Sequence, residues 1–510
     1  MTERYDVIVA GSGIAGTCAA LCAAQELGEG GRVLLASSGP VFSGSSFFRG
    51  TWGLGLVGPA GIADEGDLAR TICEVGCQQA ERPLVESFVQ GIAGAVERVE
   101  AWGVTLRQPS QDAASQAEYV PCFDHKHRSW RGLECASYRS VVGERLRSCG
   151  VDMRGGMELL DILSGDDGAV CGAVFWDEEA AAFQSVACSA LVLAGGGAAS
   201  LFSRRLTSAD CRATQQALAV QAGASLVNME FMQFMPGMVS PRKGLVFNEK
   251  TFKYMRLEPQ VEERLGGSQR TRQLLEQRSG YGPFTSRLES REVDLAVEEA
   301  GEEGLLLQPA FPAELPEFVR VYNRWLEQEA GVSPLAPLRI ALYAHASNGG
   351  IRIGADASTG VAGLYAAGEC TGGMHGADRL GGLSTANCLV FGMRAGEHAA
   401  RWASQGGSGA ACTLPEWTAL ACEAAGEAER AMRRLMDTHC MAPRTQAGLE
   451  VAVGGLAALK GAVESDTGAA ASPAAAAERR RVQLRLQTAA AMAGAALRRP
   501  ESCGSHCMAG

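Results

Sequence analysis

The sequence lacks the features that mark membrane, secreted and nucleic-acid-binding proteins. No stretch reaches the roughly 18–20 uncharged apolar residues that a bilayer-spanning helix needs. The opening residues show neither the basic region nor the apolar core of a secretory signal. Positive charge is not in excess, since 46 lysines and arginines stand against 57 aspartates and glutamates, a formal net charge of -11. We therefore expect a cytoplasmic protein with no membrane insertion and no nucleic-acid partner.

Cysteine motifs that bind metals or haem are also missing, although the chain has 17 cysteines. Cys73 and Cys77 are four positions apart, as are Cys503 and Cys507 with His506 between them, but neither pair repeats as a zinc knuckle would. No Cys-x-x-Cys-His segment is present. We expect free thiols in a reducing setting and no metal site.

What the sequence does contain is a dinucleotide-binding pattern at its start. Residues 5–10 are an apolar run typical of a buried parallel strand, residues 14–27 have helical spacing, and residues 32–36 predict the next strand. Between the first strand and the helix lies GSGIAG (11–16), whose glycines permit a tight turn and close approach of the backbone to a pyrophosphate. The second strand runs into Ser37-Ser38 and lacks the carboxylate that holds the ribose in NAD sites, so the motif alone does not choose between FAD and NAD.

The remaining chain divides into regions of different composition. With 510 residues it is long enough for two or three domains. Residues 190–194 predict a second apolar strand that ends in three glycines, which suits a sheet resuming after an insertion. Residues 236–340 are charge-rich and predict a separate cap, whereas residues 341–400 are glycine-rich. After a linker at 405–412, helices are predicted at 415–438, 446–463 and about 478–498.

Residues 345–396 carry a resemblance to a known family. Three pieces occur in order: His-x-x-x-Gly-Gly-Ile, Gly-Leu-Tyr-Ala-Ala-Gly-Glu and His-Gly-Ala-Asp-Arg-Leu-Gly-Gly. Together they resemble the flavoprotein family of succinate dehydrogenase, fumarate reductase and L-aspartate oxidase. Residues 33–46 look most like the L-aspartate oxidase branch, and the segments MEFMQFMP (229–236) and ALRRPESCGSH also resemble family motifs.

The resemblance implies an α/β fold and an FAD cofactor. It predicts a Rossmann-like FAD-binding domain (1–235 and 341–404), an inserted α+β capping domain (236–340) and a C-terminal helical domain (413–510). Ser45 occupies the position where some relatives attach FAD through histidine, so non-covalent FAD is expected. The glycine motif and the resemblance together assign FAD binding to Gly11, Ser12, Gly13, Ala15, Gly16, Ser37, Ser38, Gly44, Ser45, Ser46, Ala194, Gly195, Gly196, Glu369, Gly381, Gly382, Ser384 and Thr385.

The resemblance also assigns substrate and catalytic residues. Arg379 matches the arginine that binds one substrate carboxylate, and His345 matches a histidine at the same end. Arg287 matches the cap arginine that transfers the proton, and Arg291 is the alternative candidate for that role. Arginine suits carboxylates because its guanidinium forms paired, charge-assisted hydrogen bonds. An arginine acid/base needs a closed site and a relay, for which Glu289 and Arg291 are candidates.

Three departures from the family pattern bear on the substrate. Gln233 is retained in the Gln-Phe-His-Pro segment, but Met235 replaces its histidine. Arg49-Gly50-Thr51-Trp52 replaces Ala-Gln-Gly-Gly, and Cys503 replaces an arginine. Losing a donor to a carboxylate costs roughly 1.5–3 kcal/mol. Arg49 or a cap residue therefore takes over the second carboxylate, or the substrate has only one. His125, His127 and Arg128 are expected in an exposed loop.

Three functions follow from the resemblance. The first is an L-aspartate oxidase-like enzyme that oxidises an amino acid to an imino acid and passes its electrons through FAD to oxygen or fumarate. The second is a fumarate reductase or succinate dehydrogenase type acting on fumarate or another enoate, with electrons from a partner protein. The third is a flavin-binding subunit with impaired catalysis. In the first two cases the substrate is a small carboxylate.

Overall fold

The computed structural model describes residues 3–110, 112, 116, 119–124, 126–406, 415–466, 468–469 and 472–509. Its central sheet has the strand order β6-β2-β1-β9-β8-β7, and β16 also pairs with β9. Parallel pairing joins β1 to β2 and β9, whereas β7, β8 and β9 form an antiparallel meander. The bounds of these strands are β1 (Arg4–Ala10), β2 (Val33–Ala36), β6 (Asp152–Arg154), β7 (Met157–Ser164), β8 (Val170–Asp177), β9 (Ala182–Leu193) and β16 (Leu364–Ala366).

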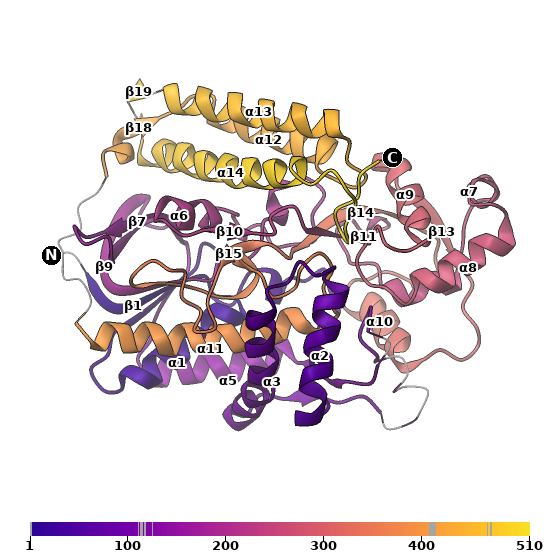
Figure 1. The fold of residues 1–510 in the computed structure, drawn as a ribbon, viewed down its shortest axis with the longest axis horizontal. Coiled ribbons are helices and arrows are strands. Elements are labelled where there is room, and N and C mark those ends of the chain that lie inside the picture. The colour runs from indigo at the N-terminus through magenta and orange to yellow at the C-terminus, as the bar shows by residue number, and fades with distance from the viewer. Residues whose placement is uncertain are drawn as a thin grey trace.

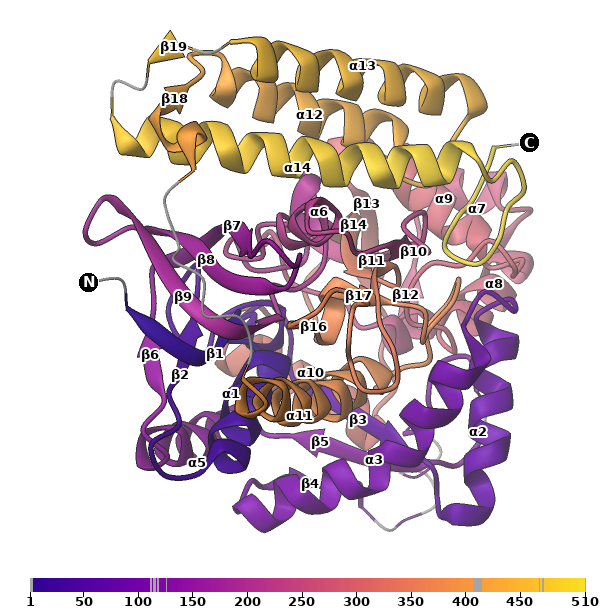
Figure 2. The same cartoon turned by 60° about the vertical axis from the view of Figure 1, so that its left-hand side comes forward.

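Two helices pack against each other on one side of this sheet, α1 (Ile14–Leu27) and α11 (Leu383–Ser404) (Figures 1 and 2). Their backbones approach closely because small residues meet. A Cβ at Gly392 or Gly396 of α11 would overlap backbone atoms of Ala15 or Ala19 in α1. The predicted first strand, glycine turn and helix are therefore confirmed, and both helices begin at the same edge of the sheet.

The cap region combines helices with a second sheet, of order β11-β14-β13-β12. The predicted domain boundaries stay a prediction; those near 235 and 340 fall inside strands β11 and β14, which pair with each other. The bounds are β11 (Met232–Ser240), β12 (Met255–Arg256), β13 (Leu305–Pro309), β14 (Leu338–Ser347), α7 (Pro259–Arg264), α8 (Ser268–Arg278), α9 (Arg291–Glu299) and α10 (Glu317–Gln328).

Three C-terminal helices form a layer along the opposite side of the molecule, yellow in both views (Figures 1 and 2). They are α12 (Ala425–His439), α13 (Gln446–Ser465) and α14 (Pro473–Leu497). The helix predicted from residue 415 begins only at Ala425. The residues before Ala425 do not belong to this helix. One of them, Trp417, donates a hydrogen bond from its indole to Asp161, 2.7 Å away. Within the described residues, no helix combines the length and apolar character that crossing a membrane requires.

A third set of elements packs against α11. The strands β3 (Leu54–Gly58), β4 (Leu106–Arg107) and β5 (Ser129–Leu133) form a small antiparallel sheet. It lies near the helices α2 (Ile62–Val75), α3 (Arg82–Trp102) and α5 (Cys135–Ser148). The segment between β4 and β5 approaches the cap, since Phe123 packs edge-on against Tyr281.

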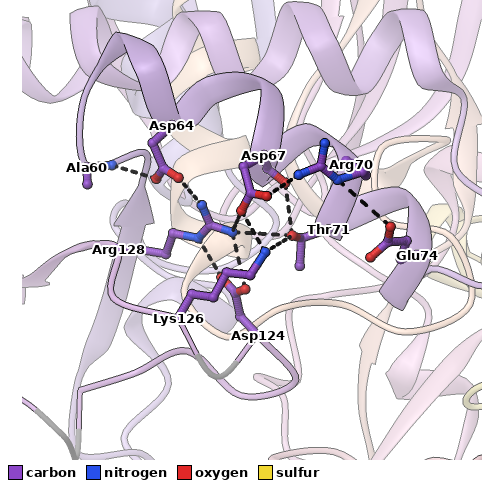
Figure 3. Close-up of polar contacts among 9 residues, drawn as sticks. All are labelled: Ala60, Asp64, Asp67, Arg70, Thr71, Glu74, Asp124, Lys126 and Arg128. Atoms are coloured by element: carbon purple, nitrogen blue, oxygen red, sulfur yellow. Dashed lines mark hydrogen bonds and ion pairs between the residues drawn. The ribbon is translucent and has the colours of Figure 1, made fainter.

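Arg128, expected in an exposed loop, is instead buried in an ion-pair cluster (Figure 3). Its guanidinium donates to Asp124 at 2.6 Å and to Asp67 at 2.8 Å, and it also pairs with Asp64. Asp64 and Asp67 belong to the first turns of α2, so these ion pairs attach Arg128 and Asp124 to that helix. The expectation was wrong because these partners lie about sixty positions away in the sequence; His127 is exposed, and His125 lies outside the described residues.

Replacing Arg128 by methionine is expected to lower the free energy of unfolding by about 3 kcal/mol, because Asp124 is then left buried without its charge partner. Urea unfolding followed by circular dichroism measures this change. The double variant Arg128→Met, Asp124→Leu removes both charges and should be more stable than the single variant. A single variant as stable as the native chain would show that the cluster contributes nothing.

Candidate active site

A long cleft runs from the start of α1 to Arg379, along the edge of the sheet where α1 and α11 begin. Gly16 and Gly381, also assigned to FAD binding, do not line it. The assigned residues that do line it are Gly11, Ser12, Gly13, Ala15, Ser37, Ser38, Gly44, Ser45, Ser46, Ala194, Gly195, Gly196, Glu369, Gly382, Ser384 and Thr385.

The two helix starts give the cleft its electrostatic character. Gly13 and Gly382 are the N-terminal caps of α1 and α11, and glycine has no side chain with which to cap the helix. At the start of α1, the Ile14 N–H donates to Ser46 Oγ at 3.3 Å. Gly11 has φ +123°, and a Cβ there would overlap the Ala194 carbonyl oxygen, so only glycine allows this turn. Helix starts present backbone N–H groups and a positive dipole end to anions. The residues present therefore fit the pyrophosphate of a dinucleotide.

The Ser37-Ser38 end of the cleft gains a carboxylate from a distant segment. Ser12 Oγ donates to Ser37 Oγ at 2.8 Å, and Ser38 Oγ donates to the backbone carbonyl of Asp210, also at 2.8 Å. Asp210 lines the cleft here. Asp210 lies about 170 positions after Ser38, and no local motif surrounds it, so the sequence pattern does not indicate its role.

Glu369 lies in the middle of the cleft. Its carboxylate accepts a hydrogen bond from the backbone N–H of Ser347 at 2.9 Å, and burial raises its pKa. One carboxylate oxygen is thus held by the protein backbone, while the side chain still lines the cleft. This placement is compatible with the FAD-binding role predicted for Glu369.

Arg379 and His345 line the other end of the cleft together. Arg379 Nε donates to Gln233 Oε1 at 3.1 Å, which fixes one edge of the guanidinium. Burial and the nearby Arg379 charge lower the pKa of His345 to about 3, so its imidazole is neutral at physiological pH. Its Nδ1 has no hydrogen-bond partner within the described part of the chain. The arrangement offers a cation and a neutral imidazole to an anionic ligand.

Met235 offers no polar group to a ligand at the Arg379 end of the cleft. It is buried in an apolar cluster with Leu206, Val246, Ala341 and Tyr343. The methionine therefore fills space where the family histidine would supply a donor. The structure places no hydrogen-bonding side chain at this position of β11.

Arg287 reaches the site through Asp378, the residue before Arg379. Arg287 Nε donates to Asp378 Oδ2 at 2.9 Å, and Thr285 Oγ1 donates to the same oxygen at 2.7 Å. The Arg287 side chain is 34 % exposed and lies over the Phe123 ring, so it does not line the cleft itself. Burial raises the pKa of Asp378 to about 6, against the lowering effect of Arg287.

The proposed relay residues of the cap lie elsewhere. Glu289 is 62 % exposed and pairs with Arg270, and Arg291 donates to the backbone carbonyl of Ser286. Asp378 is instead the carboxylate that contacts Arg287. The sequence offered a signal for it, since Asp378 lies inside the matched motif beside Arg379.

A second cavity, of about 680 Å³, adjoins the cleft; we call it the aromatic cavity. The cleft and the aromatic cavity have six lining residues in common, including Thr51 and Gly382. Arg49 and Gly381 line this cavity and not the cleft. Its aromatic side chains contact one another in a row: Trp52 packs against Phe318, Phe318 against Tyr119, and Tyr119 against Trp130. The role given to Arg49 stays a prediction.

Metal ligands do not gather anywhere in the described ranges, where no three histidine, cysteine, aspartate or glutamate side chains form a group that could hold an ion. No disulfide joins any of the cysteines in these ranges.

Comparison with known proteins identifies relatives over nearly the whole chain. Residues 6–253 and 285–385 match a family described as FAD binding domain, and residues 429–509 match one described as fumarate reductase flavoprotein C-term. An L-aspartate oxidase from Halobacterium salinarum is 30% identical over 482 residues, which cover 90% of this chain and 88% of that protein. A fumarate reductase flavoprotein subunit from Escherichia coli is 25% identical over 440 residues, 80% of this chain and 70% of that protein.

Solved structures share the fold at lower identity. The Mycobacterium smegmatis Sdh1 complex in the apo form superimposes with a TM-score of 0.78 at 23% identity, covering 100% of this chain and 89% of that one. A quinol-fumarate reductase with menaquinol gives 0.79 at 20% identity, covering 100% and 93%. The predicted α/β fold class, with its FAD-binding and C-terminal helical domains, and the FAD cofactor are confirmed.

Proposed function

The chain is an FAD-dependent oxidoreductase that belongs to the flavoprotein family of succinate dehydrogenase, fumarate reductase and L-aspartate oxidase, and we propose that it oxidises a small amino dicarboxylate of the L-aspartate type. The observation that carries this proposal is the set formed by Arg379, Gln233 and the neutral His345 at one end of the cofactor cleft. The 30% identity to an L-aspartate oxidase over 90% of the chain supports it.

The chain's own residues have distinct tasks in this proposal. Arg379 binds a substrate carboxylate, and Gln233 holds the guanidinium in place. His345 is neutral and offers a hydrogen bond at the same end without adding charge. Arg287 is the proton-transfer group, and its hydrogen bond to Asp378, which Thr285 also contacts, fixes the position of its side chain. Bound FAD supplies the acceptor for the two electrons that leave the substrate. Oxygen or fumarate would be the final electron acceptor.

We propose that FAD is held without a covalent bond. Ser45 lines the cleft, and its hydroxyl is 2.6 Å from that of Thr207. A serine hydroxyl lacks the nucleophilic ring nitrogen through which some relatives attach the cofactor.

A second candidate function is the reduction of an unsaturated carboxylate other than fumarate. Two observations favour it: Met235 removes a donor for a second carboxylate, and the aromatic cavity adjoins the cleft. Walls formed by Trp52, Tyr119 and Phe318 suit a substrate that carries an apolar or aromatic group in place of that carboxylate.

Anaerobic stopped-flow absorbance of the FAD-loaded protein tests the first proposal. Mixing with L-aspartate is expected to bleach the flavin within seconds, whereas D-aspartate should not. The Arg379→Gln variant is the matched control, because it keeps the size of the side chain but loses the cation, and it should bleach far more slowly.

Other outcomes lead to different assignments. If L-aspartate does not bleach the flavin, but an aromatic enoate reoxidises the dithionite-reduced protein faster than fumarate does, the second candidate replaces the first. If none of these compounds reacts, the protein is a flavin-binding subunit or acts on a different substrate.

A further inference from the structure

Two cysteines from opposite ends of the chain lie together outside the cofactor cleft. Cys77 follows α2, and Cys503 lies in the segment after α14. The two thiols lie close enough that each shifts the pKa of the other. Each side chain is partly exposed, so small molecules can reach the pair.

The backbone around the pair explains why they meet. Both neighbouring segments are fastened to Ala377. The Ala377 N–H donates to the Gly76 carbonyl at 2.9 Å, and Ser505 Oγ donates to the Ala377 carbonyl at 2.9 Å. Cys77 follows one of these contacts, and Cys503 lies two positions before the other.

The same contacts connect the cysteine pair to the Arg287–Asp378 ion pair. Asp378 follows Ala377 directly. On the cap side, the N–H and the Oγ of Ser286 both donate to the Gly504 carbonyl at 2.8 Å. Ser286 is the residue before Arg287. These hydrogen bonds connect the segment that holds Cys503 to the segment that carries Arg287.

The surroundings make one of the two thiols acidic. The neighbouring Cys77 thiol, together with the nearby Arg499, lowers the pKa of Cys503 to about 7. The same proximity raises the pKa of Cys77, which remains a thiol. An acidic, reachable thiolate next to a second thiol is the arrangement found in redox-active cysteine pairs.

We propose that Cys77 and Cys503 form an oxidation site at which hydrogen peroxide makes an intramolecular disulfide, and that the cross-link restrains the cap segment holding Arg287. The Cys503 thiolate attacks one peroxide oxygen, the O–O bond breaks, and the departing hydroxide takes a proton to become water. The Cys77 thiol then attacks the resulting sulfenic sulfur and releases a second water. Two thiols lose two electrons and two protons, and one peroxide becomes two waters.

Peptide mapping by mass spectrometry tests the site on the FAD-loaded protein, treated with one equivalent of hydrogen peroxide at pH 7. A Cys77–Cys503 cross-link is expected, and dithiothreitol should reverse it. Trypsin leaves Cys73 with Cys77 and Cys507 with Cys503, so fragmentation must assign the linked sulfurs. Cys503 should react about three- to fourfold faster than an ordinary cysteine thiol such as that of N-acetylcysteine, because about fifteen times more of it is ionised at pH 7 while its thiolate is several times less nucleophilic.

Variants separate the proposal from unspecific oxidation. Cys149→Ser, at an exposed thiol, should leave the cross-link unchanged, whereas Cys503→Ser should abolish it. In Cys77→Ser, the sulfenic acid on Cys503 should persist and react with dimedone. A cross-link through Cys73 or Cys507, or a sulfinic acid on Cys503 with Cys77 still reduced, would overturn the proposed site.

Hydrogen exchange tests the restraint separately. Amide exchange in residues 285–290 is expected to slow severalfold in the cross-linked protein relative to the reduced protein. Equal exchange rates, with the cross-link present, would refute the transmission to Arg287. Neither measurement depends on which carboxylate the enzyme uses.

Discussion

Replacing Arg287 by alanine is expected to lower turnover by about two to four orders of magnitude, the range expected for loss of a positioned proton-transfer group. The flavin spectrum should stay unchanged, because Arg287 does not line the cofactor cleft. Single-turnover flavin reduction and reoxidation measure the effect on the chemical step directly. Arg291→Ala is the matched control: this neighbouring cap arginine donates to a backbone carbonyl and should lose little activity.

Arg287→Lys distinguishes charge from geometry. Lysine keeps the positive charge but cannot reproduce the planar fork that contacts Asp378. We expect activity between those of the native enzyme and the alanine variant. Turnover of Arg287→Ala within tenfold of the native rate would remove Arg287 from the proposed mechanism.

The partner of Arg287 predicts how turnover depends on pH. Burial raises the pKa of Asp378 from 3.8 to about 6, so its carboxylate is charged above that pH and protonated below it. The ion pair with Arg287 is lost as pH falls through about 6, and turnover should fall with it. In Asp378→Asn this limb of the pH profile should be absent. Stability changes in the opposite sense: the folded protein binds this proton more tightly, so its contribution to stability is lost as pH rises through about 6.

Local motifs made the cofactor half of the site predictable. Gly11, Gly13 and Ala15 lie within one strand–turn–helix unit, whose sequence pattern specifies both the turn and the start of the helix. Glu369 and Gly382 lie in the matched motifs, so the resemblance could be carried over residue by residue. All five line the same cleft.

The contacts that position Arg287 and Arg128 were not predictable in the same way. The Arg287–Asp378 pair joins residues 91 positions apart, and Arg128 meets Asp64 and Asp67 from about sixty positions away. Such pairs depend on how whole elements pack, and no periodicity or spacing in one sequence encodes them. The exposed loop expected around Arg128 was wrong for this reason.

Arg379 should account for most of the affinity for the substrate carboxylate. Its guanidinium lines the cleft, and burial lowers its pKa without a carboxylate of the protein paired to it in the described contacts. Gln233 accepts from one edge and leaves the other N–H groups for a ligand. A bound carboxylate would therefore give this buried charge a direct partner, in addition to its longer-range attraction to Glu369.

Arg379→Gln is accordingly expected to weaken substrate binding by ~2–5 kcal/mol, the cost of removing one member of a buried, hydrogen-bonded charge pair. The dissociation constant of a non-reacting dicarboxylate, measured by its perturbation of the flavin spectrum, gives this loss without contribution from chemistry. Gln233→Ala should cost less, because it frees the guanidinium but keeps the cation. If both variants bind the dicarboxylate as tightly as the native enzyme does, the carboxylate is held elsewhere, and Arg49 in the aromatic cavity becomes the residue to replace next.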